Sequence, residues 1–155
     1  MNFTKLGLIG AVCATALLGN TVALAADTTS VTVSATVVGT CKFTGPGSVS
    51  FTLDPSLGGS VAGTVAQPTF WCTKGTGYTI TDNGGGNTSN GSKRMKNGAA
   101  TPEYIPYSFT YTATGTGAGA SSPLTLNIAS SVAAADYLNV SAGSYSDTVT
   151  LSITP

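Results

Sequence analysis

The stretch from residue 147 to residue 155 reads Asp-Thr-Val-Thr-Leu-Ser-Ile-Thr-Pro, and from Thr148 onward its side chains alternate between polar and apolar. Val149, Leu151 and Ile153 therefore fall on one face, and threonine and serine fall on the other. A period of two is typical of a β-strand with one buried face. The same alternation recurs along most of residues 30–154, where apolar residues at helical spacing are hard to find. The sequence predicts an all-β domain.

Short strands separated by turn sequences are expected throughout this domain. The turns are marked by glycine, asparagine, proline and aspartate. We expect strands over residues 30–38, 40–44, 49–53, 69–73, 78–81, 105–112, 124–128, 137–140 and 148–154. Many short strands separated by such turns favour a β-sandwich.

The first 25 residues have the pattern of a secretory signal peptide. Lys5 precedes an apolar run from Leu6 to Leu18, which is too short to span a bilayer. The small residues of Ala23-Leu24-Ala25 fit a cleavage site, so the mature chain is predicted to begin at Ala26 or Asp27. An uncleaved anchor is the alternative, but no stop-transfer sequence follows the run.

The charge of the predicted mature chain argues against nucleic acid as a partner. Six basic residues less Lys5 leave five, against six acidic residues. Without a basic excess there is no electrostatic attraction to phosphates. Charged residues make up only 8% of the chain, so its surface is expected to consist of small uncharged side chains. Such a surface suits packing against other protein.

Two cysteines, Cys41 and Cys72, remain after the predicted cleavage, because Cys13 is lost with the signal peptide. In an exported chain they are expected to form a disulfide. Free or metal-bound thiols are the alternative, but the chain has no histidine, so a zinc site lacks ligands. The closed loop of about 30 residues corresponds to about 3 to 4 kcal/mol of stabilisation. Trp71 is expected to pack beside this disulfide.

The sequence offers no credible catalytic centre, and we expect neither a cofactor nor a metal. Without histidine, a serine or cysteine nucleophile lacks its usual base. The carboxylates Asp54, Glu103, Asp136 and Asp147 are the candidates for a glycosidase pair. Nothing in the sequence brings two of them together, and Asp54, Asp136 and Asp147 lie where aspartate favours local backbone hydrogen bonds. The chain is therefore not expected to be an enzyme.

The stretch 82–101 is rich in glycine and asparagine and holds the basic residues Lys93, Arg94 and Lys96. A basic loop of this kind is a possible ligand site, but no aromatic side chain stands among the charges. We interpret the stretch as a solvated hairpin or connection that is dispensable for folding and for any assembly.

The segment leading to Cys41 repeats the alternation of residues 147–155. Val31, Val33, Ala35 and Val37 fall on one face, and threonine and serine fall on the other. Such a strand carries unpaired N–H and C=O groups unless it finds a neighbour. It therefore either folds back into its own domain or pairs with another chain, and the residues alone leave both possibilities open.

Several motifs together resemble the spore coat protein U domain family, which includes subunits of archaic chaperone-usher pili. They are the strand leading into Cys41, Phe70-Trp71-Cys72, Lys93-Arg94-Met95 with Ile105-Pro106-Tyr107, and the run from Gly143 to Val149. Tyr145-x-Asp147-Thr148 followed by alternating apolar residues is the most specific of them. The sequence departs from the family pattern after Tyr107, at Ser108-Phe109-Thr110-Tyr111-Thr112.

The resemblance implies an incomplete immunoglobulin-like β-sandwich that is completed by a donor strand. Its domains would be a signal peptide (1–25), an N-terminal donor strand (26–38) and a pilin-like domain (39–155). The donor residues would be Val31, Val33, Ala35 and Val37. They would enter a groove of the next subunit, edged by Val149, Leu151 and Ile153.

The same resemblance implies partners and a location. The partners would be identical or related pilin subunits, a periplasmic chaperone and an outer-membrane usher. The product would be a fibre on the cell surface, exported through the periplasm, for adhesion or biofilm formation. The alternatives are a self-complete sandwich of a surface or spore coat layer and a sugar-binding tip module.

Overall fold

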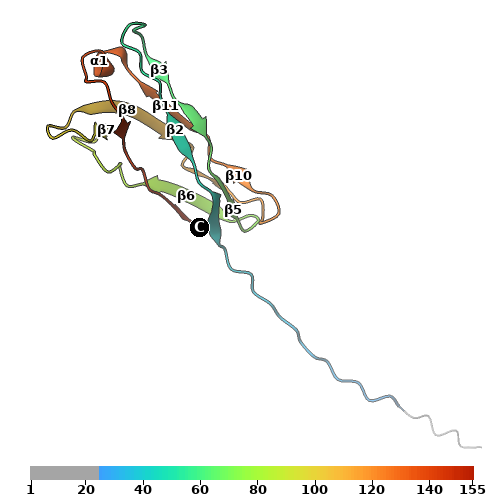
Figure 1. Ribbon diagram of the computed structural model, residues 1–155. Coiled ribbons are helices and arrows are strands. Elements are labelled where there is room, and N and C mark those ends of the chain that lie inside the picture. Colours follow the sequence, from blue (N-terminus) through green and yellow to red (C-terminus); the bar gives the residue numbers. More distant parts are fainter. Residues whose placement is uncertain (1–24) are drawn as a thin grey trace, which may run out of the picture. The chain divides into compact units, whose positions relative to one another are not determined.

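The computed structural model describes residues 25–155, so the predicted signal peptide lies outside the described residues except for Ala25 (Figure 1). The chain divides into a unit that ends at Ala35 and a domain of residues 36–155. Residues 25–40 contain no helix or strand. Within the described part of the chain, no helix is long and apolar enough to cross a membrane.

The domain is built almost entirely from short strands, which confirms the all-β prediction. In chain order the elements are β1 (Cys41–Gly45), β2 (Ser48–Ser50), β3 (Val61–Ala62), β4 (Thr64–Ala66), β5 (Thr69–Cys72), β6 (Gly77–Asp82), β7 (Lys93–Asn97), β8 (Tyr104–Tyr111), β9 (Thr114–Thr116), β10 (Leu124–Thr125), β11 (Ile128–Val132), α1 (Ala134–Tyr137), β12 (Tyr145–Ser146) and β13 (Leu151–Thr154).

Antiparallel pairing joins these strands into four sheets. Their orders are β1-β5-β10, β12-β7-β8-β11-β3, β13-β6-β9 and β2-β4. Strands β1 and β13 each have one partner among the described strands and therefore lie at sheet edges. Helix α1 lies at one end of the domain, and the C-terminus lies at the other (Figure 1).

The disulfide between Cys41 and Cys72 forms as predicted and joins β1 to β5. The two cysteines are direct partners in the antiparallel ladder, 31 residues apart in sequence. Phe70 and Cys72 are buried on one face of β5, whereas Trp71 between them is only half-buried. Because side chains alternate along a strand, Trp71 points to the opposite face from Cys72. The expectation that Trp71 packs beside the disulfide is wrong.

The buried side chains form two separate clusters. One contains Phe70, Cys72, Ile80, Leu126 and Ile128. The other is smaller and contains Ile105, Val132 and Tyr137. The half-buried apolar side chains packed against these clusters include Phe43, Val49 and Phe51 from the region around β2 and Leu151 and Ile153 from the C-terminal segment. The domain therefore has two partial cores rather than one continuous core.

The strand predicted over residues 137–140 is wrong, because this part of the chain begins in helix α1. The preceding alanines are strong helix formers. Tyr137 is buried, and its hydroxyl donates a hydrogen bond to the carbonyl of Gly59 at 2.9 Å. The helix propensity of these alanines and the burial of Tyr137 both favour the short helix.

The basic stretch was interpreted as a solvated hairpin or connection. Its three cations lie on strand β7, which pairs with β8, and the solvated part of the interpretation is wrong for Lys93 and Arg94. Lys93 forms an ion pair with Asp82 at 2.8 Å between Nζ and Oδ1, and both side chains are largely buried. The guanidinium of Arg94 stacks 4.2 Å from the ring centre of Tyr104. Lys96 alone is exposed.

Replacing Lys93 with serine is therefore expected to lower the free energy of unfolding by about 1 to 3 kcal/mol, because the carboxylate of Asp82 would lose its cation while staying largely buried. The matched variant Lys96→Ser changes an exposed lysine of the same strand and should shift this free energy by less than about 0.5 kcal/mol. Urea unfolding of the two variants measures the difference. Equal stability of both variants would contradict the assignment of Lys93 to the fold.

The pH dependence provides a second test of this ion pair. Burial disfavours ionisation of Asp82, but hydrogen bonds from Lys93, Gly84 and Tyr111 and the charge of Lys93 outweigh it and hold the pKa below its ordinary value of 3.8. A carboxyl with a lowered pKa stabilises the fold above its unfolded pKa and loses this contribution as the pH falls through the folded pKa. The stability gap between wild type and Lys93→Ser should therefore shrink below about pH 4.

Candidate assembly groove and donor segment

A cavity of about 810 Å³ opens between the segment that contains β1 and β2 and the C-terminal segment of the domain. Phe43, Val49 and Phe51 line it from the first segment, and Val149 and Leu151 line it from the second. Pro68, Met95, Tyr107, Phe109, Ile128 and Tyr145 contribute further to its lining. Its surface is therefore mainly aromatic and aliphatic.

A second cavity of about 580 Å³ continues the first toward helix α1. The two cavities share Val49, Phe51, Met95 and Tyr145. The second cavity ends among Leu53, Pro55, Tyr137 and Val140. We call the two cavities together the assembly groove. It runs from a Phe43/Leu151 end to a Pro55/Val140 end.

Strand edges with free backbone groups flank this groove. Strand β1 pairs with β5 alone among the described strands, and β13 pairs with β6 alone. Residues 147–150, which precede β13, belong to no strand, although they continue its alternating burial. An apolar trough between two unpaired edges has the form of a sandwich that lacks one strand.

The burial pattern beside the groove indicates the same gap. From Tyr145 to Thr154, half-buried and exposed residues alternate at every position, and none is fully buried. The inward side chains Phe43, Val49 and Phe51 of the opposite wall are likewise only half-buried. In contrast, the inward side chains of β5 and β11 are fully buried. The groove walls therefore have the pattern of a buried strand without the neighbour that would cover it.

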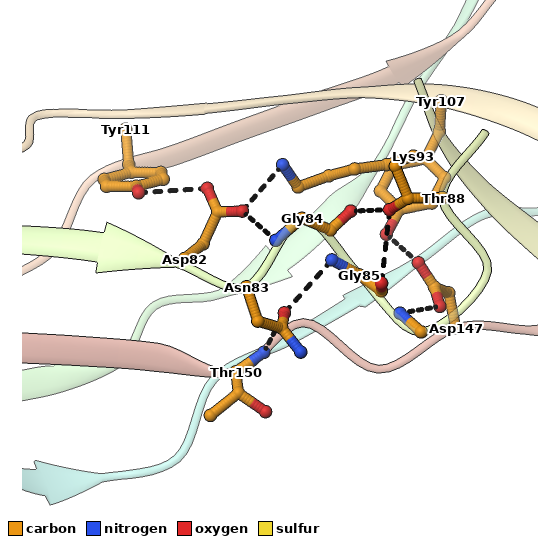
Figure 2. Close-up of polar contacts among 11 residues, drawn as sticks. Asp82, Asn83, Gly84, Gly85, Thr88, Lys93, Tyr107, Tyr111, Asp147 and Thr150 are labelled. Carbon is orange, nitrogen blue, oxygen red and sulfur yellow. Dashed lines mark hydrogen bonds and ion pairs between the residues drawn. The ribbon is translucent and has the colours of Figure 1, made fainter. Parts of the chain in front are cut away.

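Asp147 lines the groove and fixes its C-terminal wall to a distant loop (Figure 2). Its Oδ1 accepts hydrogen bonds from the backbone N–H groups of Gly86 at 2.9 Å and Asn87 at 3.1 Å. Its Oδ2 accepts a hydrogen bond from the hydroxyl of Tyr107 at 2.7 Å. We expected Asp147 to make local backbone hydrogen bonds, but its partners lie 40 to 61 residues away.

Tyr107 supplies a neutral donor to this network. Burial, the hydrogen bond to Asp147 and the charge of Asp147 all raise the pKa of its phenol. The hydroxyl therefore keeps its proton at physiological pH, and Asp147 keeps its partner. The family motif residues Tyr107 and Asp147 meet here and position the wall of the groove.

The loop around Gly86 and Asn87, which binds the Asp147 side chain, also forms a hydrogen bond with the segment before β13. The side-chain oxygen of Asn83 accepts hydrogen bonds from the N–H groups of Gly85 and Thr150, each at 3.0 Å (Figure 2). Gly85 has a φ of +93°, and a Cβ there would lie 2.5 Å from Asp147 Oδ2. A residue other than glycine would thus displace Asp147 from its position.

The predicted donor residues lie outside any described strand and are exposed. Val31, Val33 and Val37 are 81%, 90% and 82% exposed, and Ala35 is also exposed. Three branched apolar side chains on one face of an extended segment are an unusual solvent-exposed arrangement. They form a surface that another chain could cover.

Two of the three predicted acceptor residues line the groove. They are Val149 and Leu151. Ile153 lies beyond the cavity, where it is paired with Ile80 across the ladder and packs against the larger buried cluster. The opposite wall, formed by Phe43, Val49 and Phe51, was not predicted from the sequence.

The fold and the groove define a β-sandwich with an open strand position. Residues 27–152 match the Spore Coat Protein U domain, and the chain belongs to this family. This confirms the resemblance drawn from the motifs. Membership of this family agrees with the prediction of a structural, non-enzymatic protein that is exported through the periplasm to the cell surface.

Among solved structures, the chain is similar to the pre-assembly complex of the chaperone CsuC with the tip adhesion subunit CsuE from archaic chaperone-usher Csu pili of Acinetobacter baumannii. The identity is 20% and the TM-score is 0.45. The likeness covers 76% of this chain but only 40% of that one. A comparison with curated proteins found no match.

Proposed function

We propose that the protein is a pilin subunit that polymerises by donor-strand exchange into a surface fibre of the chaperone-usher type. The donor stripe of one subunit (Val31, Val33, Ala35 and Val37) enters the assembly groove of the next subunit. A periplasmic chaperone occupies the groove beforehand, and an outer-membrane usher exports the growing chain. Such a fibre would serve adhesion or biofilm formation.

The observation that carries this proposal is the groove itself, an apolar trough between two unpaired strand edges whose inward side chains are only half-buried. A self-complete sandwich would have covered these side chains with its own last strand. Addition of an extended segment to such edges is β-augmentation, in which main-chain hydrogen bonds give affinity and alternate side chains give specificity.

The donor stripe and the groove wall have the same length. From Val31 to Val37 there are six residue steps, as there are from Tyr145 to Leu151 along the groove wall. At about 3.3 Å per residue both spans measure about 20 Å. A strand in the groove would also contact half-buried residues around both core clusters, such as Phe43 of one and Phe51 of the other. It would thereby join the two partial cores.

The burial of the donor stripe provides enough free energy for a lasting joint. Each valine contributes about 1.5 to 3 kcal/mol on full burial. Three valines therefore contribute up to about 9 kcal/mol, which is an upper bound. The main-chain ladder along both free edges adds to this value, at about 0.5 to 1.5 kcal/mol per hydrogen bond.

Hydrogen bonds fix the short segment between donor stripe and domain. The hydroxyl of Thr73 accepts a hydrogen bond from the N–H of Thr40 at 3.1 Å and lies 3.3 Å from the carbonyl oxygen of Val38. The N–H of Thr73 donates to the carbonyl of Thr40 at 2.9 Å. These bonds attach residues 38–40 to the residue that follows β5.

A synthetic peptide of residues 29–38, added to the purified full chain, tests the proposal. We expect a one-to-one complex by native mass spectrometry, arrest of polymer growth, and a rise in Tm of about 5 to 10 °C at saturating peptide. The matched peptide with Val33→Asp should have none of these effects. A stable monomer that binds neither peptide would favour the self-complete sandwich.

A further inference from the structure

Three exposed apolar side chains are not part of the donor stripe, and they lie at the two ends of the domain. Val38 is 73% exposed, Leu57 is 81% exposed and Leu138 is 39% exposed. Val38 directly follows Val37, so it points away from the face that carries the stripe and does not enter the groove with it. Donor-strand exchange by itself leaves all three in solvent.

Leu57 lies in a turn that is stabilised by two hydrogen bonds to Asp54. Asp54 Oδ1 accepts a hydrogen bond from the N–H of Ser56 at 2.9 Å, and the carbonyl of Asp54 accepts one from the N–H of Leu57 at 3.1 Å. An aspartate at the first position of a turn stabilises it in this way. The exposure of Leu57 is thus a property of an ordered turn rather than of a loose loop.

Leu57 and Leu138 belong to the same end of the domain. The hydrogen bond from Tyr137 to the carbonyl of Gly59 ties the helix to the turn. Pro55 and Val140, which flank the two leucines in sequence, both line the far end of the assembly groove. Figure 1 shows α1 at the end of the domain opposite to the C-terminus. The two leucines therefore lie beside the Pro55/Val140 end of the groove.

Val38 is held at the opposite end by the Thr73 hydrogen bonds described above. Gly39 contributes to this attachment, because a Cβ there would lie 3.0 Å from Thr76. The segment that links donor stripe and domain is therefore both short and fixed. Val38 directly follows Val37 in the chain, so a neighbouring subunit that binds Val37 in its groove lies next to Val38.

We propose that Val38 of one subunit packs against Leu57 and Leu138 of the next, so that a second copy of this chain covers all three side chains. The contact rests on the proposed donor-strand exchange and requires the donor to run antiparallel to residues 145–154. Val37 then reaches the Pro55/Val140 end of the groove, and Val38 emerges beside the leucines. Antiparallel ladders are also slightly more stable per residue than parallel ones.

The experiment is cysteine cross-linking in assembled fibres of the full chain. The variant Val38→Cys, Leu57→Cys is exported, its fibres are confirmed by electron microscopy, and a short bismaleimide is added. Cys41 and Cys72 do not react, because they form the disulfide. The control variant Val38→Cys, Thr125→Cys places the second thiol on an exposed residue of β10.

We expect a ladder of covalent multimers on a denaturing gel for the first pair and none for the control. Leu57→Ser fibres should also form but bend more readily, with a shorter persistence length in micrographs. Fibres without a ladder, or equal ladders from both pairs, would overturn the contact between Val38 and the two leucines and leave the exchange intact. Absence of fibres from the wild-type chain would instead overturn the proposed function, and the contact with it.

Discussion

A subunit with Val33→Asp is expected to lose its ability to donate a strand while it still folds and still accepts one. Val33 is 90% exposed in the unpolymerised chain, so the change leaves the domain intact. In the groove, the new carboxylate would be buried without a cation. Among the described residues that line the groove, the only charged one is Asp147, which is itself an anion. An uncompensated buried charge costs about 3 to 5 kcal/mol.

The expected result is a weakening of the joint by about two to three and a half orders of magnitude, at about 1.4 kcal/mol per tenfold change. Ser34→Asp is the matched control, because it places the same charge on the opposite face of the same segment. Electron microscopy should show fibres for Ser34→Asp and none for Val33→Asp. Fibres of normal length from pure Val33→Asp would contradict the assignment of the donor stripe.

Mixing with wild type separates donation from acceptance. A Val33→Asp subunit can receive a strand but cannot add its own to another groove, so it ends a chain. Deletion of residues 26–37 should have the same effect. Wild-type fibres grown with either variant are expected to shorten as the variant fraction rises. Unchanged fibre length would show that the variant is excluded altogether.

The C-terminal wall of the groove was predictable from the sequence because its alternation is unbroken. Val149 and Leu151 fall on one face of a strand whatever partner the strand has. The opposite wall carries a similar alternation around Phe43, Val49 and Phe51, but the register of β1 shifts between Phe43 and Gly45. This irregularity interrupts the period, so the wall was not predicted as part of a site.

Other features depend on contacts that sequence spacing does not encode. Asp147 meets Gly86 across 61 residues, and Lys93 of β7 meets Asp82 of β6, which belongs to another sheet. Lys93 was interpreted as a solvated charge because local composition says nothing about an ion pair formed by the fold. The disulfide was predictable for a different reason, since only two cysteines remained to pair.

A chain with a copy of residues 29–38 fused after Pro155 through a flexible linker is expected to complete itself and remain monomeric. The copy fills the chain's own groove, so neither a neighbour's donor stripe nor a peptide can enter. Burial of three valines predicts a stabilisation of several kcal/mol and a rise in Tm of at least about 10 °C. The control fusion carries Val31→Ser, Val33→Ser and Val37→Ser in the copy and should polymerise like wild type.

The length of that linker also determines the direction of the donor strand. In the antiparallel orientation the copy starts beside the C-terminal end of β13, so a turn of about four to six residues is sufficient. In the parallel orientation the linker must first cross the groove, about 20 Å, which a glycine-serine chain spans on average only with about 12 or more residues. Monomers from the short linker would establish the antiparallel direction on which the contact between Val38 and Leu57 depends. Monomers from the long linker alone would place Val38 at the Phe43/Leu151 end and exclude that contact.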